Sequence, residues 1–229
     1  QDGYNFSYTY QNINGGADQN LINGNATVVS DDYKSGATFF VSNRTRTAYD
    51  ANADNFSELP ELKNTSFGVN AFFLPTENSK LEVNLSKLYE YRFGGEMVDK
   101  PAYLTQQSEE RDHHVLMASL DYQINFNDDK NSLILYYGGQ RTDRDHYTGI
   151  IPDDTDAQTA FFADPPYGIS EVTTHQGGIQ LNNRFDNFLG GTTVLTTGVE
   201  YVYDDVMDEI ASYNYLIDQT TKNLGVFVQ

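Results

Sequence analysis

The feature that most constrains the fold is a long alternation of residues within the segment 111–144. The even positions from 114 to 126 read His, Leu, Ala, Leu, Tyr, Ile and Phe, and the odd positions between them end in Asp, Gln and Asn. A period of two indicates a β-strand with one apolar and one polar face. Residues 127–131 (NDDKN) are turn formers. We therefore predict a long antiparallel hairpin.

The length of this hairpin points to a membrane. Strands in ordinary globular proteins run to about five or six residues, whereas a strand that crosses a bilayer at a steep tilt needs about nine to eleven. No apolar stretch approaches the length of a transmembrane helix, about 18 residues. The sequence therefore predicts an all-β protein, a transmembrane antiparallel β-barrel whose signal is spread over alternating segments.

Similar strand patterns recur along the chain, and their connections alternate in length. We predict about ten strands, at residues 2–11, 20–29, 35–45, 65–74, 80–92, 114–126, 132–140, 171–185, 192–205 and 222–229. Tight turns begin near 31, 76, 127 and 186, and long polar connections span 46–64, 93–110, 145–170 and 206–221. Such a rhythm is typical of outer-membrane barrels, with short periplasmic turns and long extracellular loops.

The composition agrees with a sheet that has one apolar face and one face in contact with water. Mean hydropathy is −0.56, yet aromatic residues make up 14% of the chain and gather near predicted strand ends, as membrane-interface girdles do. A soluble all-β sandwich is the alternative. The net charge of −19 argues against nucleic acid as a partner, because phosphates require clustered Lys and Arg. The absence of Cys and of an HExxH motif argues against a zinc enzyme.

Several stretches resemble the barrel of TonB-dependent outer-membrane receptors. They are LYEYRFGGEMVDKP (88–101), HHVLMASLDYQINF (113–126), GVEYVYDDVMDE (198–209) and NLGVFVQ (223–229). The family takes up ferric siderophores, cobalamin and colicins through a barrel of about 22 strands that encloses an N-terminal plug. The resemblance implies that residues 1–229 are roughly the first ten barrel strands, with the plug, the TonB box and the remaining strands absent from this chain.

The resemblance also implies a function. The chain would be part of a receptor for TonB-dependent uptake of a scarce ligand, such as a ferric siderophore or another metal chelate, across the outer membrane of a Gram-negative cell. The expected partners are outer-membrane lipid, the receptor's own plug and remaining strands, TonB through the N-terminal region, and the small ligand. Nothing covalent happens to the ligand, so we expect no enzyme activity and no cofactor.

Candidate ligand-binding residues lie where predicted strands meet long connections. Guanidinium groups recognise carboxylates and phosphates and would attract an anionic chelate, with aromatic contact area beside them. The alternative is that these arginines balance neighbouring acids. The candidates are Arg92, Tyr103, Arg111, Arg141, Arg144, His146, Tyr147, Phe161, Phe162, Tyr213 and Tyr215. By parity we predict lumen-facing positions at Glu82, Asn84, Asp121, Gln123, Asn125, Gln180, Asn182, Arg184 and Glu200.

Catalytic and metal-binding patterns are weak. The carboxylate–imidazole runs 112–114 and 143–146 place neighbours on opposite faces of a strand, so we predict no catalytic residues. Acidic loops offer hard oxygens to Ca²⁺, at Asp153, Asp154 and Asp156 or at Asp204, Asp205 and Asp208, although neither run has the spacing of an EF-hand. A solvated acidic loop is the alternative, and no metal site is predicted.

Two other functions fit the pattern of strands. Ten strands can close by pairing 2–11 with 222–229, which would give a barrel protease like the omptins, with Asp and His at its extracellular rim. A soluble β-rich binding module is the third interpretation. It predicts a protein that stays in solution without detergent.

Overall fold

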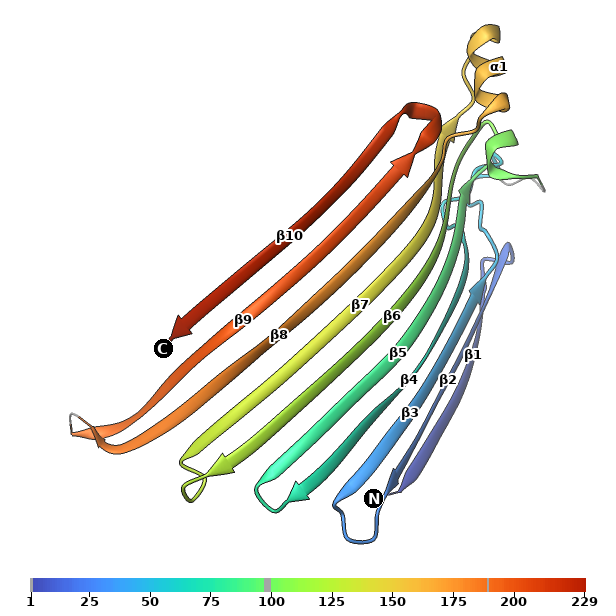
Figure 1. Ribbon diagram of the computed structural model, residues 1–229. Helices are drawn as coiled ribbons and strands as arrows, with labels where there is room; N and C mark the ends of the chain where they lie inside the picture. Colours follow the sequence, from blue (N-terminus) through green and yellow to red (C-terminus); the bar gives the residue numbers. More distant parts are fainter. Residues whose placement is uncertain (1, 97–99, 189) are drawn as a thin grey trace.

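The computed structural model describes residues 2–96, 100–188 and 190–229, and these form one antiparallel sheet of ten strands in chain order (Figure 1). The strands are β1 (Gly3–Ile13), β2 (Ala17–Val29), β3 (Ser35–Arg46), β4 (Glu61–Thr76), β5 (Ser79–Gly95), β6 (Gln107–Phe126), β7 (Asn131–Ile150), β8 (Tyr167–Phe188), β9 (Gly191–Ile210) and β10 (Tyr215–Val228). The all-β prediction is therefore confirmed. Within the described ranges, helical structure is limited to α1 (Thr155–Ala163) and two short 3-10 segments, η1 (Ala102–Leu104) and η2 (Ala211–Tyr213). Among the helices of the described ranges, none is long and apolar enough to cross a membrane.

The sheet is open. Figure 1 shows ten long, curved strands side by side, with β1 and β10 at opposite edges of the sheet. Within the described residues β1 pairs only with β2, and β10 only with β9. The alternative of a closed ten-stranded barrel is therefore wrong for this chain, because the curvature over ten strands does not bring the two edges together.

The two ends of the sheet differ in the length of their connections. All connections at one end, here called the lower end, are tight turns, whereas the upper end carries the longer connections 47–60, 96–106 and 151–166 with α1, together with the short turns 14–16 and 211–214 (Figure 1). In the turn from β6 to β7, Asn127, Asp128 and Asp129 all have left-handed φ angles of 58°, 52° and 60°. Asn and Asp tolerate that region, as predicted for this turn.

The strands extend further at the upper end than the sequence predicts. The predicted long connection 206–221 is wrong, since β9 continues to Ile210, β10 begins at Tyr215, and only residues 211–214 connect them. Val206 pairs with Gln219 and Asp208 with Ile217 in regular register. The added part is rich in polar residues, so it lacks the apolar alternation that marks a strand in the sequence.

Side chains alternate between the two faces along each strand, and paired residues in neighbouring strands point to the same face. The sheet therefore has one apolar and one polar face. The apolar face carries Phe39, Val69, Leu85 and Ala118 in one row, and Ile179, Val199 and Val226 in another. All nine positions predicted to face a lumen lie on the polar face. Glu82, Asp121, Tyr136, Gly178 and Glu200 form one of its rows.

Glycines on the polar face are covered by aromatic rings. A Cβ at Gly68 would lie 2.6 Å from Cζ of Phe40 and 2.7 Å from the Leu85 carbonyl oxygen. A Cβ at Gly36 would likewise lie 2.6 Å from a ring carbon of Phe72. The same arrangement recurs at Gly178 with Tyr136 and at Gly198 with Phe227. These glycines therefore let large rings lie flat against the sheet.

Candidate functional site

Arginines gather on the polar face near the upper ends of four strands. One row of paired residues runs from Arg46 on β3 through Leu62 and Arg92 to Arg111 and His146. The row below it runs through Arg44, Asn64, Glu90, His113 and Arg144. We call Arg44, Arg46, Arg92, Arg111 and Arg144 the arginine band. Of the sequence candidates, Arg92, Arg111, Arg144 and His146 are thus brought together.

The arginine band lies above the apolar part of the sheet. On the apolar face, Val41 and Leu116 are the last apolar residues of β3 and β6 before Asn43 and His114. The arginine band begins beyond that level on the opposite face. Its groups therefore lie outside the apolar band and near the long connections.

The arginines differ in their partners. Arg92 and Arg111 form ion pairs with Glu90 and Glu109, with N···O distances of 3.4 and 2.7 Å. The other three donate to uncharged oxygens: Arg44 to Oε1 of Gln19, Arg46 to the carbonyl of Pro60 and Arg144 to Oγ of Ser170, with shortest distances of 2.7, 3.0 and 2.8 Å. In a chain of net charge −19, guanidinium groups held on uncharged oxygens are suited to receive an external anion.

The positive charges affect one another. Burial lowers the pKa of Arg46, and the neighbouring Arg44 and Arg92 lower it further. Burial likewise lowers the pKa of His113, and Arg144 adds to the effect while Glu90 opposes it. Nε2 of His113 and Nε of Arg144 are both buried without a hydrogen-bond partner.

A cavity of about 750 Å³ adjoins the arginine band. Arg92 and Tyr213 line it, and both are candidates from the sequence. The other lining residues are Phe56, Ser57, Pro60, Gly94, Gly95, Gln107, Ser108, Glu109, Thr148, Gly149 and Ile150. The volume suits a small organic ligand.

Arg141 does not join the arginine band. It projects from the apolar face of β7, where it forms ion pairs with Asp143 at 2.9 Å and Glu171 at 3.3 Å. The side chains of Arg141, Asp143 and Glu171 are each about half exposed to solvent. This arginine balances neighbouring acids, which is the alternative that the sequence left open.

Several aromatic candidates hold the upper connections together. Tyr147 is fully buried and packs with Phe161 of α1 and Ala102 of η1, and Tyr103 packs against this cluster. These rings thus fix the connections to the sheet instead of offering surface to a ligand. Phe162, Tyr213 and Tyr215 are exposed, by 40%, 59% and 40%.

The sequence prediction missed Arg44, Arg46 and His113 as members of this site. Arg44 and Arg46 are two residues apart, and a strand that includes both places them on one face. The strand predicted at 35–45 ends before Arg46, which places that residue in a loop. In the sequence, His113 stands out only as a possible catalytic partner of Asp112, whose side chain points to the other face.

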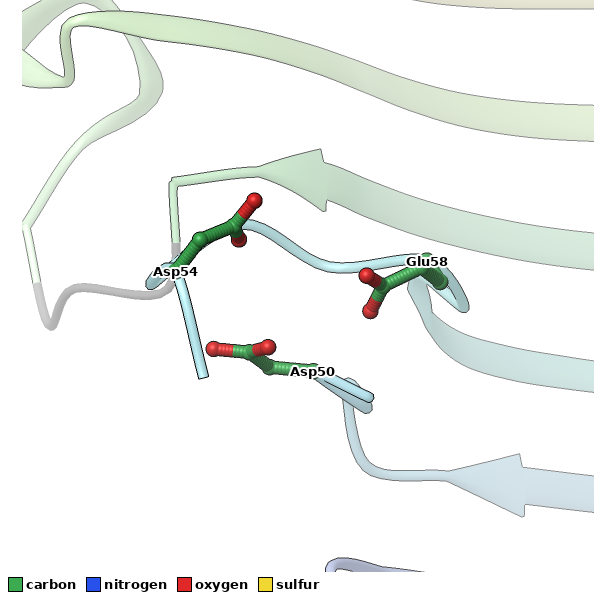
Figure 2. A group of neighbouring side chains, drawn as sticks. All are labelled: Asp50, Asp54 and Glu58. Atoms are coloured by element: carbon green, nitrogen blue, oxygen red, sulfur yellow. The ribbon is translucent and has the colours of Figure 1, made fainter. Parts of the chain in front are cut away.

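One group of carboxylates in the described part of the chain could hold a metal ion. Figure 2 shows Asp50, Asp54 and Glu58 facing one another in the connection from β3 to β4, with one oxygen of each within 4.8 Å of the others. The two acidic runs considered for Ca²⁺ in the sequence, 153–156 and 204–208, form no such group within the described residues. Asp154 caps α1 by accepting from the amide of Ala157 at 2.9 Å.

The loop of Figure 2 is expected to loosen in acid. Desolvation raises the pKa of Asp50, but backbone N–H donors of Asn55 and Ala53, at 2.8 and 2.6 Å, outweigh it and lower the pKa overall. A lowered pKa stabilises the loop above the ordinary value of 3.8, and this stabilisation is lost as the pH falls through the lower folded value.

Limited proteolysis at pH 6 and pH 3 measures this loss. Cleavage within 50–58 should be slow at pH 6 and fast at pH 3, and Asp50→Asn should cleave fast at both. Asp153→Asn is the control, because its side chain makes no hydrogen bond among those of the described residues. Equal cleavage of wild type and Asp50→Asn at pH 6 would contradict the role of Asp50.

The arrangement can bind an anion. His146 Nε2 lies 3.1 Å from Oδ1 of Asp208. The nearest serine, Ser170, hydrogen-bonds that same carboxylate and not the imidazole. A nucleophile activated by the histidine would need a bond to it. No protein-family model matches this chain, and neither does any curated protein.

Proposed function

We propose that this chain forms part of the wall of a TonB-dependent receptor in the outer membrane of a Gram-negative cell. The observation that carries the proposal is the two-faced sheet. Large apolar side chains stand exposed on the apolar face, among them Leu85 at 48%, Leu116 at 49% and Ile179 at 52%. A contiguous apolar surface of this extent requires a covering, and lipid is the covering that fits long tilted strands.

The dimensions of the strands support insertion in a bilayer. In β6 the apolar face is continuous from Phe126 to Leu116, which matches the span of about nine to eleven residues that a tilted strand needs. The whole of β6 has 20 residues. Its upper part, with the arginine band, therefore projects beyond the membrane into the surroundings from which a ligand arrives.

The polar face supports a receptor role. In this proposal it borders a lumen that holds a plug, and further strands pair with the free edges of β1 and β10. The arginine band and its cavity capture a scarce anionic ligand, such as a ferric siderophore or another metal chelate. TonB acts through the plug, and the ligand passes unchanged, so the chain is not an enzyme.

Membrane insertion can be tested on the full chain. It should require detergent to stay dispersed and should enter phospholipid vesicles, where its strands become protected from added protease. The native protein should sediment with the outer-membrane fraction and resist extraction by alkaline carbonate. A chain that stays monomeric in buffer without detergent would instead support a soluble β-rich binding module.

The receptor role has a separate test. A strain that lacks the gene should lose uptake of a radiolabelled metal chelate under metal limitation, and uptake should return with the intact gene. Loss of the TonB energy supply should give the same defect. Unchanged uptake of every chelate supplied, by a protein that is in the outer membrane, would contradict the receptor role while leaving the barrel intact.

A further inference from the structure

His113 lies within the arginine band, on the strand next to Arg144. Its cross-strand partners on the polar face are Glu90 on β5 and Arg144 on β7. The charged or titratable groups around it are Glu90 and Arg92 on β5, Arg111 on its own strand, and Arg144 and His146 on β7. Burial and the three arginines outweigh Glu90 and lower the pKa of His113, which favours the neutral imidazole when no ligand is bound.

The arginine band is wide. It reaches from β3 to β7, and four strand spacings of about 4.8 Å amount to about 19 Å. A single small anion cannot contact both ends of such a surface. A ligand with separated anionic groups can, with one group near Arg44 and Arg46 and another near His113 and Arg144.

We infer that the arginine band binds a ligand carrying at least two separated anionic groups, and that His113 takes up a proton when the ligand binds. This inference deepens the proposed function, on which it rests for the route by which the ligand arrives. It names the chemical class of the ligand and a coupled protonation.

The proton uptake follows from the position of His113. The imidazole lies beyond Leu116, outside the segment of β6 that we place in the membrane. Burial and the arginines lower the pKa of His113, and an anion bound to those arginines cancels the charge that opposes protonation. Nε2 is buried and has no hydrogen-bond partner among the described residues, so a proton added to the ring breaks no hydrogen bond of that atom and adds to the positive charge of the arginine band. Binding should therefore strengthen as the pH falls.

The probes are biphenyl-4,4′-disulfonate, whose two sulfonates stand at opposite ends of a rigid rod, and biphenyl-4-sulfonate, and none of these sulfonates titrates near neutral pH. Titration calorimetry of the full chain in detergent, in two buffers of different ionisation enthalpy, reports the affinity and the protons taken up. The disulfonate should bind at least about tenfold more tightly than the monosulfonate, because it reaches two arginine sites. Its affinity should rise by up to about tenfold per pH unit below neutral, with uptake of up to one proton.

Variants separate the two parts of the inference. His113→Gln should abolish proton uptake and make the affinity for the disulfonate independent of pH below neutral, since it removes the titrating group. Arg46→Gln with Arg144→Gln should reduce the preference for the disulfonate over the monosulfonate. His175→Gln, on the apolar face, is the matched control and should behave like the wild type.

Three results would overturn the inference: equal affinity for the two probes, unchanged proton uptake in His113→Gln, or loss of that uptake in His146→Gln alone. Failure of the proposed function gives a different result. A chain that needs no detergent but binds the disulfonate with proton uptake would contradict the membrane proposal and leave this inference standing. A chain that inserts in vesicles but binds neither probe would contradict this inference and leave the membrane proposal standing.

Discussion

Val83→Arg is expected to destabilise the membrane-inserted chain by about 2–4 kcal/mol, the range for a basic residue at the lipid-facing midplane of a β-barrel. Val83 lies between Leu81 and Leu85 on the apolar face of β5 and is 39% exposed in the bare chain. A guanidinium there would meet hydrocarbon with no partner of opposite charge. Urea unfolding from phospholipid vesicles measures the change.

Ser86→Arg is the matched control, on the same strand but on the polar face, where Ser86 pairs with Met117. Its side chain would point into water, so the free energy of unfolding should change by less than about 1 kcal/mol. Equal losses for the two variants would mean that the two faces of β5 meet the same environment. The proposed orientation of the sheet in a membrane would then fail.

Gly68→Ala is expected to destabilise the fold by about 1–3 kcal/mol, the usual cost of overpacking. The added Cβ would lie 2.6 Å from Cζ of Phe40 and 2.7 Å from the carbonyl oxygen of Leu85. Phe40 can rotate away, but the backbone oxygen belongs to the ladder between β4 and β5 and cannot move without disturbing it. Chemical unfolding of the variant should therefore begin at a lower denaturant concentration.

Gly138→Ala serves as the comparison, because a Cβ there has nothing within 4 Å. Gly138 lies on the same face in the middle of β7, so the same substitution should leave stability unchanged or slightly raise it. In the double variant Gly68→Ala/Phe40→Leu, only the clash with the ring is relieved. Stability should return in part, and a full return would show that the Leu85 oxygen does not restrict the site.

Local patterns in the sequence predict much of this fold. The run 114–126 and the turn after it appear in β6 and β7 with the expected facing of side chains. A period of two and turn residues with left-handed angles are properties of neighbouring residues, so a single stretch of sequence carries them. The number of strands follows from the same signals repeated along the chain.

Polar strand ends and the site itself are harder to predict. Residues 206–210 and 215–221 pair as strands although polar side chains occupy both faces there, so no apolar period marks them. The arginine band depends on which residues of β3, β5, β6 and β7 share a row, and that register is set by pairings between distant parts of the chain. Arg44 and Arg144 therefore share a row in the structure, although 99 residues separate them in the sequence.

The neighbour order of the sheet has a consequence for how the chain folds. Each strand pairs only with the strands before and after it in sequence, so the sheet can grow from local loop closures without a distant segment having to arrive first. The hairpins with short turns are natural kinetic units, and they are β1–β2, β2–β3, β4–β5, β6–β7, β8–β9 and β9–β10. They would form early, on a microsecond timescale of about 1–10 μs for an isolated hairpin. The longer upper connections would then set the pace at which one hairpin docks on the next.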